Sequence, residues 1–219
     1  MSSSQFYLII HSGYQSVFIG LYNRTQAVSI QTLDKKMVSG FLFITLLDIL
    51  KCHELIFADL SFIGVHAGPA PFTTLRVGVT TSNGIAFAAG LPLVAVNGLE
   101  VLSNLYPEYT VLLNAFCDDV YVGQGSSLSC QNIDAFLHNQ ASSITQPVTY
   151  IGNGVALHHE KIKHVLGDRA VLLHDYPYEA SIDMIAQYAY RQWSAGANSV
   201  KQVMPVYMKE YSAKMATNR

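Results

Sequence analysis

A chain of 219 residues with 13 basic and 15 acidic side chains has a formal net charge of −2 and no run of like charge. Direct, autonomous nucleic-acid binding is therefore not expected. Half of the residues are apolar and the mean hydropathy is +0.25, yet no run approaches the roughly 18 apolar residues of a membrane helix. Excess apolar character without a membrane span indicates surface buried against another protein.

The pattern at the N-terminus predicts three strands, separated by turns at Gly13 and Asn23. A helix is expected from Asp34, a plausible N-cap, to Lys51. "MSSSQFYLII" has neither a basic segment nor a cleavage site, so no signal peptide is expected. The elements predicted up to the middle of the chain are strands at 6–12, 16–22, 27–32, 62–65 and 91–98 and helices at 35–51, 74–90 and up to Leu105.

The second half of the chain opens like the first. "IIHSGYQSVFIG" (9–20) aligns with "LLNAFCDDVYVG" (112–123) at a constant offset of 103 residues, close to half the chain length. Both have two apolar residues, a polar one, a turn and an apolar strand that ends in glycine, so we predict a duplicated hairpin that opens two related lobes. The later elements predicted are a strand with a glycine turn at 148–155, helices at 158–166 and 179–193, and an extended segment at 204–209.

The helix expected over 35–51 is apolar around most of its circumference, with only a narrow polar stripe at Thr45, Asp48 and Lys51. Such a helix is buried on two sides. One side fits the sheet of its own lobe. The other side requires either more of this chain, as in a central helix of one core, or a partner.

Steps of four from Thr74 give Gly78, Ser82, Ala86 and Gly90, an unbroken ridge of small residues if the segment is helical. Two interior glycines cost about 2 kcal/mol against alanine, so propensity alone favours a strand. The regular ridge favours a helix, because it lets another helix backbone approach closely.

The loop before this helix resembles a phosphate-binding loop but lacks its chemistry. Pro69 and Pro71 have no backbone N–H, and the lysine of GxxxxGK[ST] is missing, which excludes a P-loop. Arg76 is expected to be a structural ion-pair or rim residue rather than a phosphate ligand.

The sequence also gives no pattern typical of a metal site or of a reactive cysteine. The cluster of His158, His159 and His164 lacks the i, i+4 spacing of helical metal ligands, so a solvated histidine patch is expected. Asp118 and Asp119 are expected to be turn residues. No metal ligand and no cofactor site is predicted. The three cysteines, Cys52, Cys117 and Cys130, have no CxxC spacing and indicate buried, reduced thiols in a cytoplasmic protein.

"AGPAPFTTLRVGVTTSNGIAFAAGLPLVAVNGLEVL" (67–102) resembles the signature of the TsaB (YeaZ) family, which runs roughly GPGSFTGLRVG, a small-residue helix, GLP and a strand. "LLNAFCDDVYVG", "YIGNGV" and "PVYMK" resemble later segments of the same family, so the resemblance extends over nearly the whole chain. TsaB proteins are non-catalytic subunits of the bacterial machinery that makes threonylcarbamoyladenosine at position 37 of tRNAs.

The resemblance implies an α/β, two-lobed actin/hexokinase/Hsp70-like (ASKHA) fold with duplicated hairpin-led lobes, here residues 1–106 and 107–219. It implies a pseudo-enzyme that dimerises with a TsaD-like catalytic subunit and contacts a TsaE-like ATPase through the complex. When alone, the chain is expected to form a homodimer. It is expected to contact tRNA only indirectly and to bind no membrane. The two unusual helices would then supply the partner or dimer interface, at Phe41, Ile44, Thr74, Leu75, Gly78, Val79, Ser82, Ile85 and Ala86.

The chain departs from the family at the positions where the fold uses carboxylates. His11 stands where the first hairpin of such folds carries Asp, and Asn114 stands at the matching place in the second hairpin. Mg-ATP sites need hard oxygen ligands, so only a vestigial nucleotide site is expected, at His11, Ser12, Gly13 and Asn114. An active ASKHA kinase or ATPase is the alternative. A glycoprotease-like metallopeptidase is a more distant one, since the HxxxH pair that TsaD uses is absent.

Overall fold

The computed structural model describes residues 5–173, 176–197 and 199–208. The first lobe begins with three antiparallel strands, continues with two parallel strands, and carries its helices after the third, fourth and fifth strands. Its elements are β1 (Phe6–Ser12), β2 (Ser16–Asn23), β3 (Gln26–Asp34), α1 (Val38–Cys52), the 3-10 turn η1 (Phe57–Asp59), β4 (Ile63–Gly68), α2 (Phe72–Ala89), β5 (Leu93–Asn97) and α3 (Gly98–Leu105).

The second lobe repeats this plan with shorter elements. They are β6 (Thr110–Asn114), β7 (Asp119–Gln124), β8 (Ser127–Asn132), α4 (Ile133–Ser143), β9 (Val148–Ile151), α5 (Asn153–Leu157), α6 (His159–Leu166), the 3-10 turn η2 (Gly167–Arg169) and β10 (Ala170–Leu172). The chain then returns to the first lobe through α7 (Ile182–Ser194) and β11 (Ser199–Val200).

Apart from the added strand β11, the two sheets have the same topology. The first has the order β11-β5-β4-β1-β2-β3 and the second β10-β9-β6-β7-β8. In each, the opening three strands are antiparallel, and the next two add in parallel on the other side of the first strand. The duplicated hairpin predicted from the repeat is therefore confirmed, although the sequence pattern did not reveal β8, α4 or β10.

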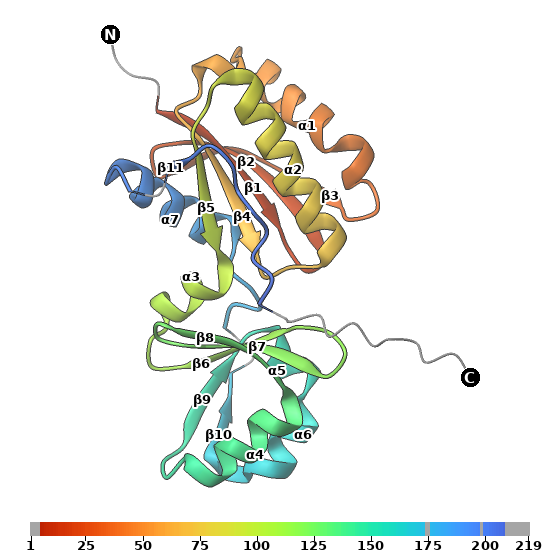
Figure 1. The fold of residues 1–219 in the computed structure, drawn as a ribbon, viewed down its shortest axis with the longest axis vertical. Helices are drawn as coiled ribbons and strands as arrows, with labels where there is room; N and C mark the ends of the chain where they lie inside the picture. The colour runs from red at the N-terminus through yellow and green to blue at the C-terminus, as the bar shows by residue number, and fades with distance from the viewer. Residues whose placement is uncertain (1–4, 174–175, 198, 209–219) are drawn as a thin grey trace, which may run out of the picture.

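Helices cover both faces of the first sheet. Figure 1 shows α1 and α2 on one face and α7 on the other, with α3 between the two lobes. Leu42, Leu46 and Leu75 belong to the core on the α1–α2 side. The core on the α7 side joins Tyr7 and Val94 of the first lobe with apolar residues of the second lobe. A third core lies between the second sheet and helices α4 and α6.

The last described part of the chain packs on the first lobe. Helix α7 contacts β1, β4 and β5, and β11 pairs antiparallel with β5. Both elements lie beyond residue 107, where the predicted division begins the second lobe, yet they pack on the sheet of the first lobe. Val203 is fully buried in the first core, held by a pair of hydrogen bonds with the side chain of Asn83.

Three local expectations differ from the structure. Asp34 ends β3 instead of capping a helix, because its main chain pairs with Ser16, and α1 starts after Met37. The last long helix begins at Ile182, since the Ser181 side chain caps it by accepting from Met184 N. Cys52 and Cys117 are exposed rather than buried. Lys209, the end of the expected extended segment, lies outside the described residues.

Candidate functional site

Helix α1 presents an apolar face that the described chain leaves uncovered. Its inner side, with Leu42 and Leu46, is buried against the first sheet. On its outer side, the side chains of Phe41, Phe43 and Ile44 are 46%, 48% and 51% exposed, and Leu47 is similarly exposed. The interpretation of α1 as the central helix of one core is thus wrong, because one side of it faces solvent.

The small-residue ridge of α2 packs on the chain's own sheet. Gly78 lies over β1, where an added Cβ would stand 2.9 Å from Ser12 Oγ and 3.4 Å from Ile10 Cγ2. The helical structure of this segment is as predicted, and Gly90 ends it in a left-handed conformation. Close approach is needed here, but by strand β1 of the same molecule rather than by a partner's helix.

Seven of the nine residues predicted for the interface are consequently buried inside this chain, which leaves them no surface to offer a partner. They are Thr74, Leu75, Gly78, Val79, Ser82, Ile85 and Ala86. Only Phe41 and Ile44 lie on the surface. The sequence has a second stripe of short side chains on the opposite side of α2, and periodicity alone does not tell which stripe faces inward.

The outward side of α2 contains Thr73, Thr80 and Gly84, and no atom lies within 4 Å of the Cβ position at Gly84. Next along this side, Phe87 is 90% exposed. It borders a pocket of about 550 Å³ between the end of α2 and β11, which Leu91 and Val200 also line. An aromatic ring this exposed beside an apolar hollow is typical of an interface anchor.

Arg76, on the exposed side of α2, forms no ion pair in the described structure. Its guanidinium lies 3.7 Å from the centre of the Phe72 ring, and its Nε donates to Tyr207 Oη at 2.8 Å. Arg76 is therefore a structural rim residue, as expected. It makes a cation–π contact with Phe72 and holds the C-terminal segment against the helix through Tyr207.

At the junction of the lobes, His11 occupies the interior of the first sheet and contacts a second histidine. The His11 and His66 ring centres are 4.7 Å apart in an edge-to-face contact, and the Phe18 ring stacks on that of His11. His66 Nδ1 donates to Ser12 O at 2.9 Å. Burial lowers the pKa of His11 well below its usual range and that of His66 to about 4, so both rings are neutral at pH 7.

The neighbouring turn joins the lobes through Tyr14, a residue that sequence reasoning did not single out. Its hydroxyl donates to Asn114 O at 2.7 Å, while its backbone N–H donates to the Glu179 carboxylate. Ser12 Oγ donates to Thr74 O, and Gly13 N donates to Ser16 O. The structure therefore brings His11, Ser12, Gly13 and Asn114 to one place. The last three are hydrogen-bonded within this chain, whereas both ring nitrogens of His11 are buried without a hydrogen-bond partner among the described residues.

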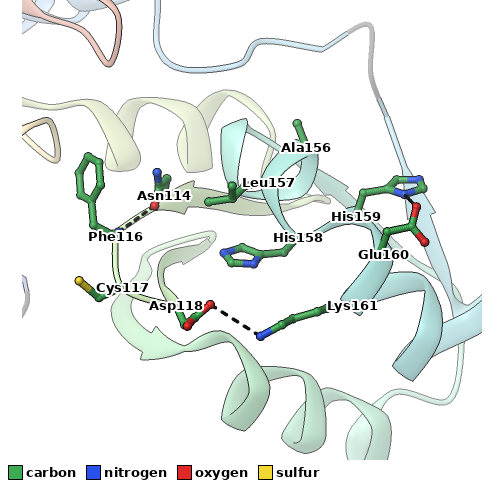
Figure 2. Close-up of a pocket in the computed structure, with 10 residues that line it drawn as sticks. All are labelled: Asn114, Phe116, Cys117, Asp118, Ala156, Leu157, His158, His159, Glu160 and Lys161. Atoms are coloured by element: carbon green, nitrogen blue, oxygen red, sulfur yellow. Dashed lines mark hydrogen bonds and ion pairs between the residues drawn. The ribbon is translucent and has the colours of Figure 1, made fainter.

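Asn114 also lines a pocket of about 530 Å³ in the second lobe, between the β6–β7 turn and the α5–α6 segment. Figure 2 shows the His158 ring lying between these two segments and the ion pair of Asp118 with Lys161 across the pocket. His158 is only 7% exposed, so the expected solvated histidine patch is wrong at this position. Desolvation, with Lys161 nearby, lowers the pKa of His158.

The β6–β7 turn is unusual because Phe116, Cys117 and Asp118 all have positive φ, between 53° and 61°. Asp118 lies in this turn, as predicted, whereas Asp119 is not a turn residue but begins strand β7. Within the described residues, no three His, Cys, Asp or Glu side chains gather in a geometry suited to a metal ion. In the same part of the chain, no helix is both long and apolar enough to span a bilayer.

Sequence comparisons find similarity to proteins named for threonylcarbamoyladenosine synthesis. Residues 42–148 match the family model described as TsaD, tRNA N6-adenosine threonylcarbamoyltransferase. The tRNA threonylcarbamoyladenosine biosynthesis protein TsaB of Bacillus subtilis (strain 168) is 28% identical over an alignment of 127 residues, which covers 52% of this chain and 56% of that protein. The chain thus matches little more than half the length of this curated relative.

Structural comparisons extend over almost the whole chain. A Pseudomonas aeruginosa protein described as similar to peptidase YeaZ has a TM-score of 0.71 at 18% identity, covering 94% of this chain and all of that one. YeaZ from Pseudomonas aeruginosa has a TM-score of 0.68 at 18% identity, covering 93% and 99%. At this identity the likeness shows the fold, and with the repeated sheet topology it confirms the predicted two-lobed actin/hexokinase-like arrangement.

Proposed function

Because its sequence and its fold both support assignment to the TsaB/YeaZ family, we propose that this chain takes part in making threonylcarbamoyladenosine in tRNA. Its role in that proposal is a non-catalytic one: it binds a TsaD-like threonylcarbamoyltransferase and supports its activity. The sequence match to a TsaB protein and the match of residues 42–148 to the TsaD family model support the pathway. The role within it is argued from the surface of the first lobe.

The single observation that carries this role is the uncovered apolar face of α1 and α2. Taking about 200 Å² for a fully exposed aromatic side chain, and somewhat less for an aliphatic one, the exposed apolar side chains of these helices present roughly 600 Å² to solvent. A stable interface takes about 800 Å² from each partner. The side chains counted are Phe41, Phe43, Ile44, Leu47, Phe72 and Phe87.

The lobe junction supports a non-catalytic role. The position of the first hairpin's carboxylate is taken by His11, which is neutral and 1% exposed, and Asn114 uses its backbone and side chain to hold the second hairpin and Tyr14. Neither side chain supplies the hard anionic oxygen that Mg²⁺ prefers. Calorimetry with Mg-ATP on the isolated chain tests the kinase or ATPase alternative, and tight binding with turnover would establish it.

Co-purification with the TsaD-like subunit of the same organism tests the proposed interface. Ile44→Glu places a carboxylate in the centre of the α1 face, so we expect the catalytic subunit to be lost from the purified complex. Val165→Glu is the matched control, because Val165 is an exposed helical residue of the second lobe, at 39%. Undiminished association of the Ile44→Glu variant, with a normal fold by circular dichroism, would reject this surface as the contact.

The remaining parts of the proposal follow from the same surface. In the absence of the catalytic subunit, the α1–α2 face would pair with a second copy of the chain, giving a homodimer. A TsaE-like ATPase and tRNA would be met only through the assembled complex, in the cytoplasm. The low overall charge of −2 supports the indirect role toward tRNA.

A further inference from the structure

A carboxylate of the chain lies directly on the β1–β2 turn at the lobe junction. Tyr14 N donates to both oxygens of Glu179, at 2.9 Å to Oε2 and 3.2 Å to Oε1. None of the ion pairs formed among the described residues includes Glu179. Its charge is therefore held by a backbone amide rather than by a cation. Burial raises the pKa of this carboxyl group, and the Tyr14 amide opposes that shift.

The turn has a glycine where the carboxylate approaches. A Cβ at residue 13 would stand 3.0 Å from Glu179 Oε1, 3.3 Å from Oε2 and 2.9 Å from Ser16 O. Gly13 does not have a positive φ, so its backbone conformation does not require glycine. The lack of a side chain matters because it leaves room for the carboxylate. A glycine that lets an anion reach a backbone N–H is the arrangement found in anion-binding turns.

Glu179 is held in place by its chain neighbours on both sides. Ala180 is buried in the core on the α7 side, and Ser181 caps α7. On the other side, Tyr178 O accepts from Asn153 N at 2.8 Å, which ties the segment to α5 of the second lobe. A carboxylate positioned in this way faces the turn at a high effective concentration, so a free anion of similar affinity competes poorly with it.

We propose that the β1–β2 turn is an anion site filled from within by Glu179, and that without this carboxylate the turn binds a phosphate group. In the intact chain the internal anion keeps the turn closed to ligands. It also holds the segment before α7 against the first hairpin, while the Tyr14 hydroxyl holds that hairpin to Asn114 of the second lobe. These contacts join the two lobes. This inference does not depend on the partner proposed above.

Amide NMR with inorganic phosphate, titrated against sodium chloride at equal ionic strength, tests the site on the full chain. In the wild type we expect the Tyr14 amide signal to stay unchanged. In Glu179→Ala we expect a saturable shift of that signal with phosphate, at an affinity at least about tenfold above any wild-type binding. Glu160→Ala, which removes an exposed carboxylate of the second lobe, should behave like the wild type.

Two further variants test whether phosphate binds at the β1–β2 turn itself. Glu179→Gln keeps the size of the side chain and an acceptor for Tyr14 N, so it should fold even if the alanine variant does not. Because its uncharged amide competes less well for the turn than the carboxylate, we expect it to bind phosphate more tightly than the wild type and more weakly than Glu179→Ala. Adding Gly13→Ala to the Glu179 variant should abolish the phosphate shift, because the new Cβ fills the space over the turn. A folded Glu179 variant whose Tyr14 signal ignores phosphate, or a shift that survives Gly13→Ala, would overturn the proposal.

Discussion

The two interior glycines of α2 provide a matched test of which side of that helix faces inward. Gly84 is exposed and has open space at its Cβ position, so Gly84→Ala should raise the free energy of unfolding by about 1 kcal/mol through helix propensity alone. Gly78→Ala gains the same propensity but places its Cβ 2.9 Å from Ser12 Oγ.

The cost at Gly78 outweighs that gain. Ser12 Oγ donates to Thr74 O at 3.1 Å, so moving it away breaks a buried hydrogen bond worth about 1 kcal/mol. Overpacking against Ile10 adds roughly 1–3 kcal/mol. We therefore expect a net destabilisation of about 1–3 kcal/mol, which places the two alanine variants some 2–4 kcal/mol apart.

Urea unfolding of the wild type and both variants, followed by circular dichroism, measures this difference. A change of 1 kcal/mol moves the thermal midpoint of a chain of this size by about 2–4 °C, so calorimetry gives an independent reading. Equal stabilisation by both substitutions would refute the reasoning, since it would mean that Gly78 does not contact β1 and that the small-residue ridge is free for a partner.

Three further predictions concern single side chains. Phe87→Ala should weaken binding of the TsaD-like partner by at least about tenfold in calorimetry while changing stability by less than about 0.5 kcal/mol, because the ring is 90% exposed. Asn83→Ala should lower the free energy of unfolding by about 1–3 kcal/mol in urea, because it leaves both backbone groups of Val203 unpaired. The pKa of His66 is lowered to about 4 by burial, so the unfolded chain binds more protons between about pH 6.5 and pH 4, and stability must fall as the pH falls. Urea unfolding should show a loss of about 2 kcal/mol from this group between pH 7 and pH 5, with His11 acting in the same direction, and His66→Gln should reduce the slope.

Much of the fold was accessible from the sequence because its strongest signals are local. Alternating apolar residues marked β1 to β3, and the repeat at 9–20 and 112–123 indicated the duplicated lobes, which the matching sheet orders confirm. The short strand β10, by contrast, has only 3 residues and too little pattern to be recognised. Asp34 was misread as a helix cap because the residue types that cap helices also end strands.

The candidate site was harder to predict because its geometry depends on contacts between distant residues. Periodicity identified α2 as a helix with a small-residue ridge, but the opposite side also has short side chains, and only the packing on β1 shows which side is buried. Nothing near Glu179 in the sequence indicates Tyr14, which lies 165 residues away. The excess apolar character of the chain did indicate exposed apolar surface, and Phe41 and Ile44, two of the residues predicted for an interface, have exposed side chains.

Hydroxyl-radical footprinting of the chain, with and without its TsaD-like partner, tests the central claim most directly. Phe41, Phe43 and Phe87 are exposed on α1 and α2, and Phe116, 46% exposed in the second lobe, is an internal control of the same residue type. We predict that the partner protects the first three rings from oxidation and leaves Phe116 unchanged. Equal oxidation of Phe41, Phe43 and Phe87 in the free chain and in the complex would contradict the proposed interface.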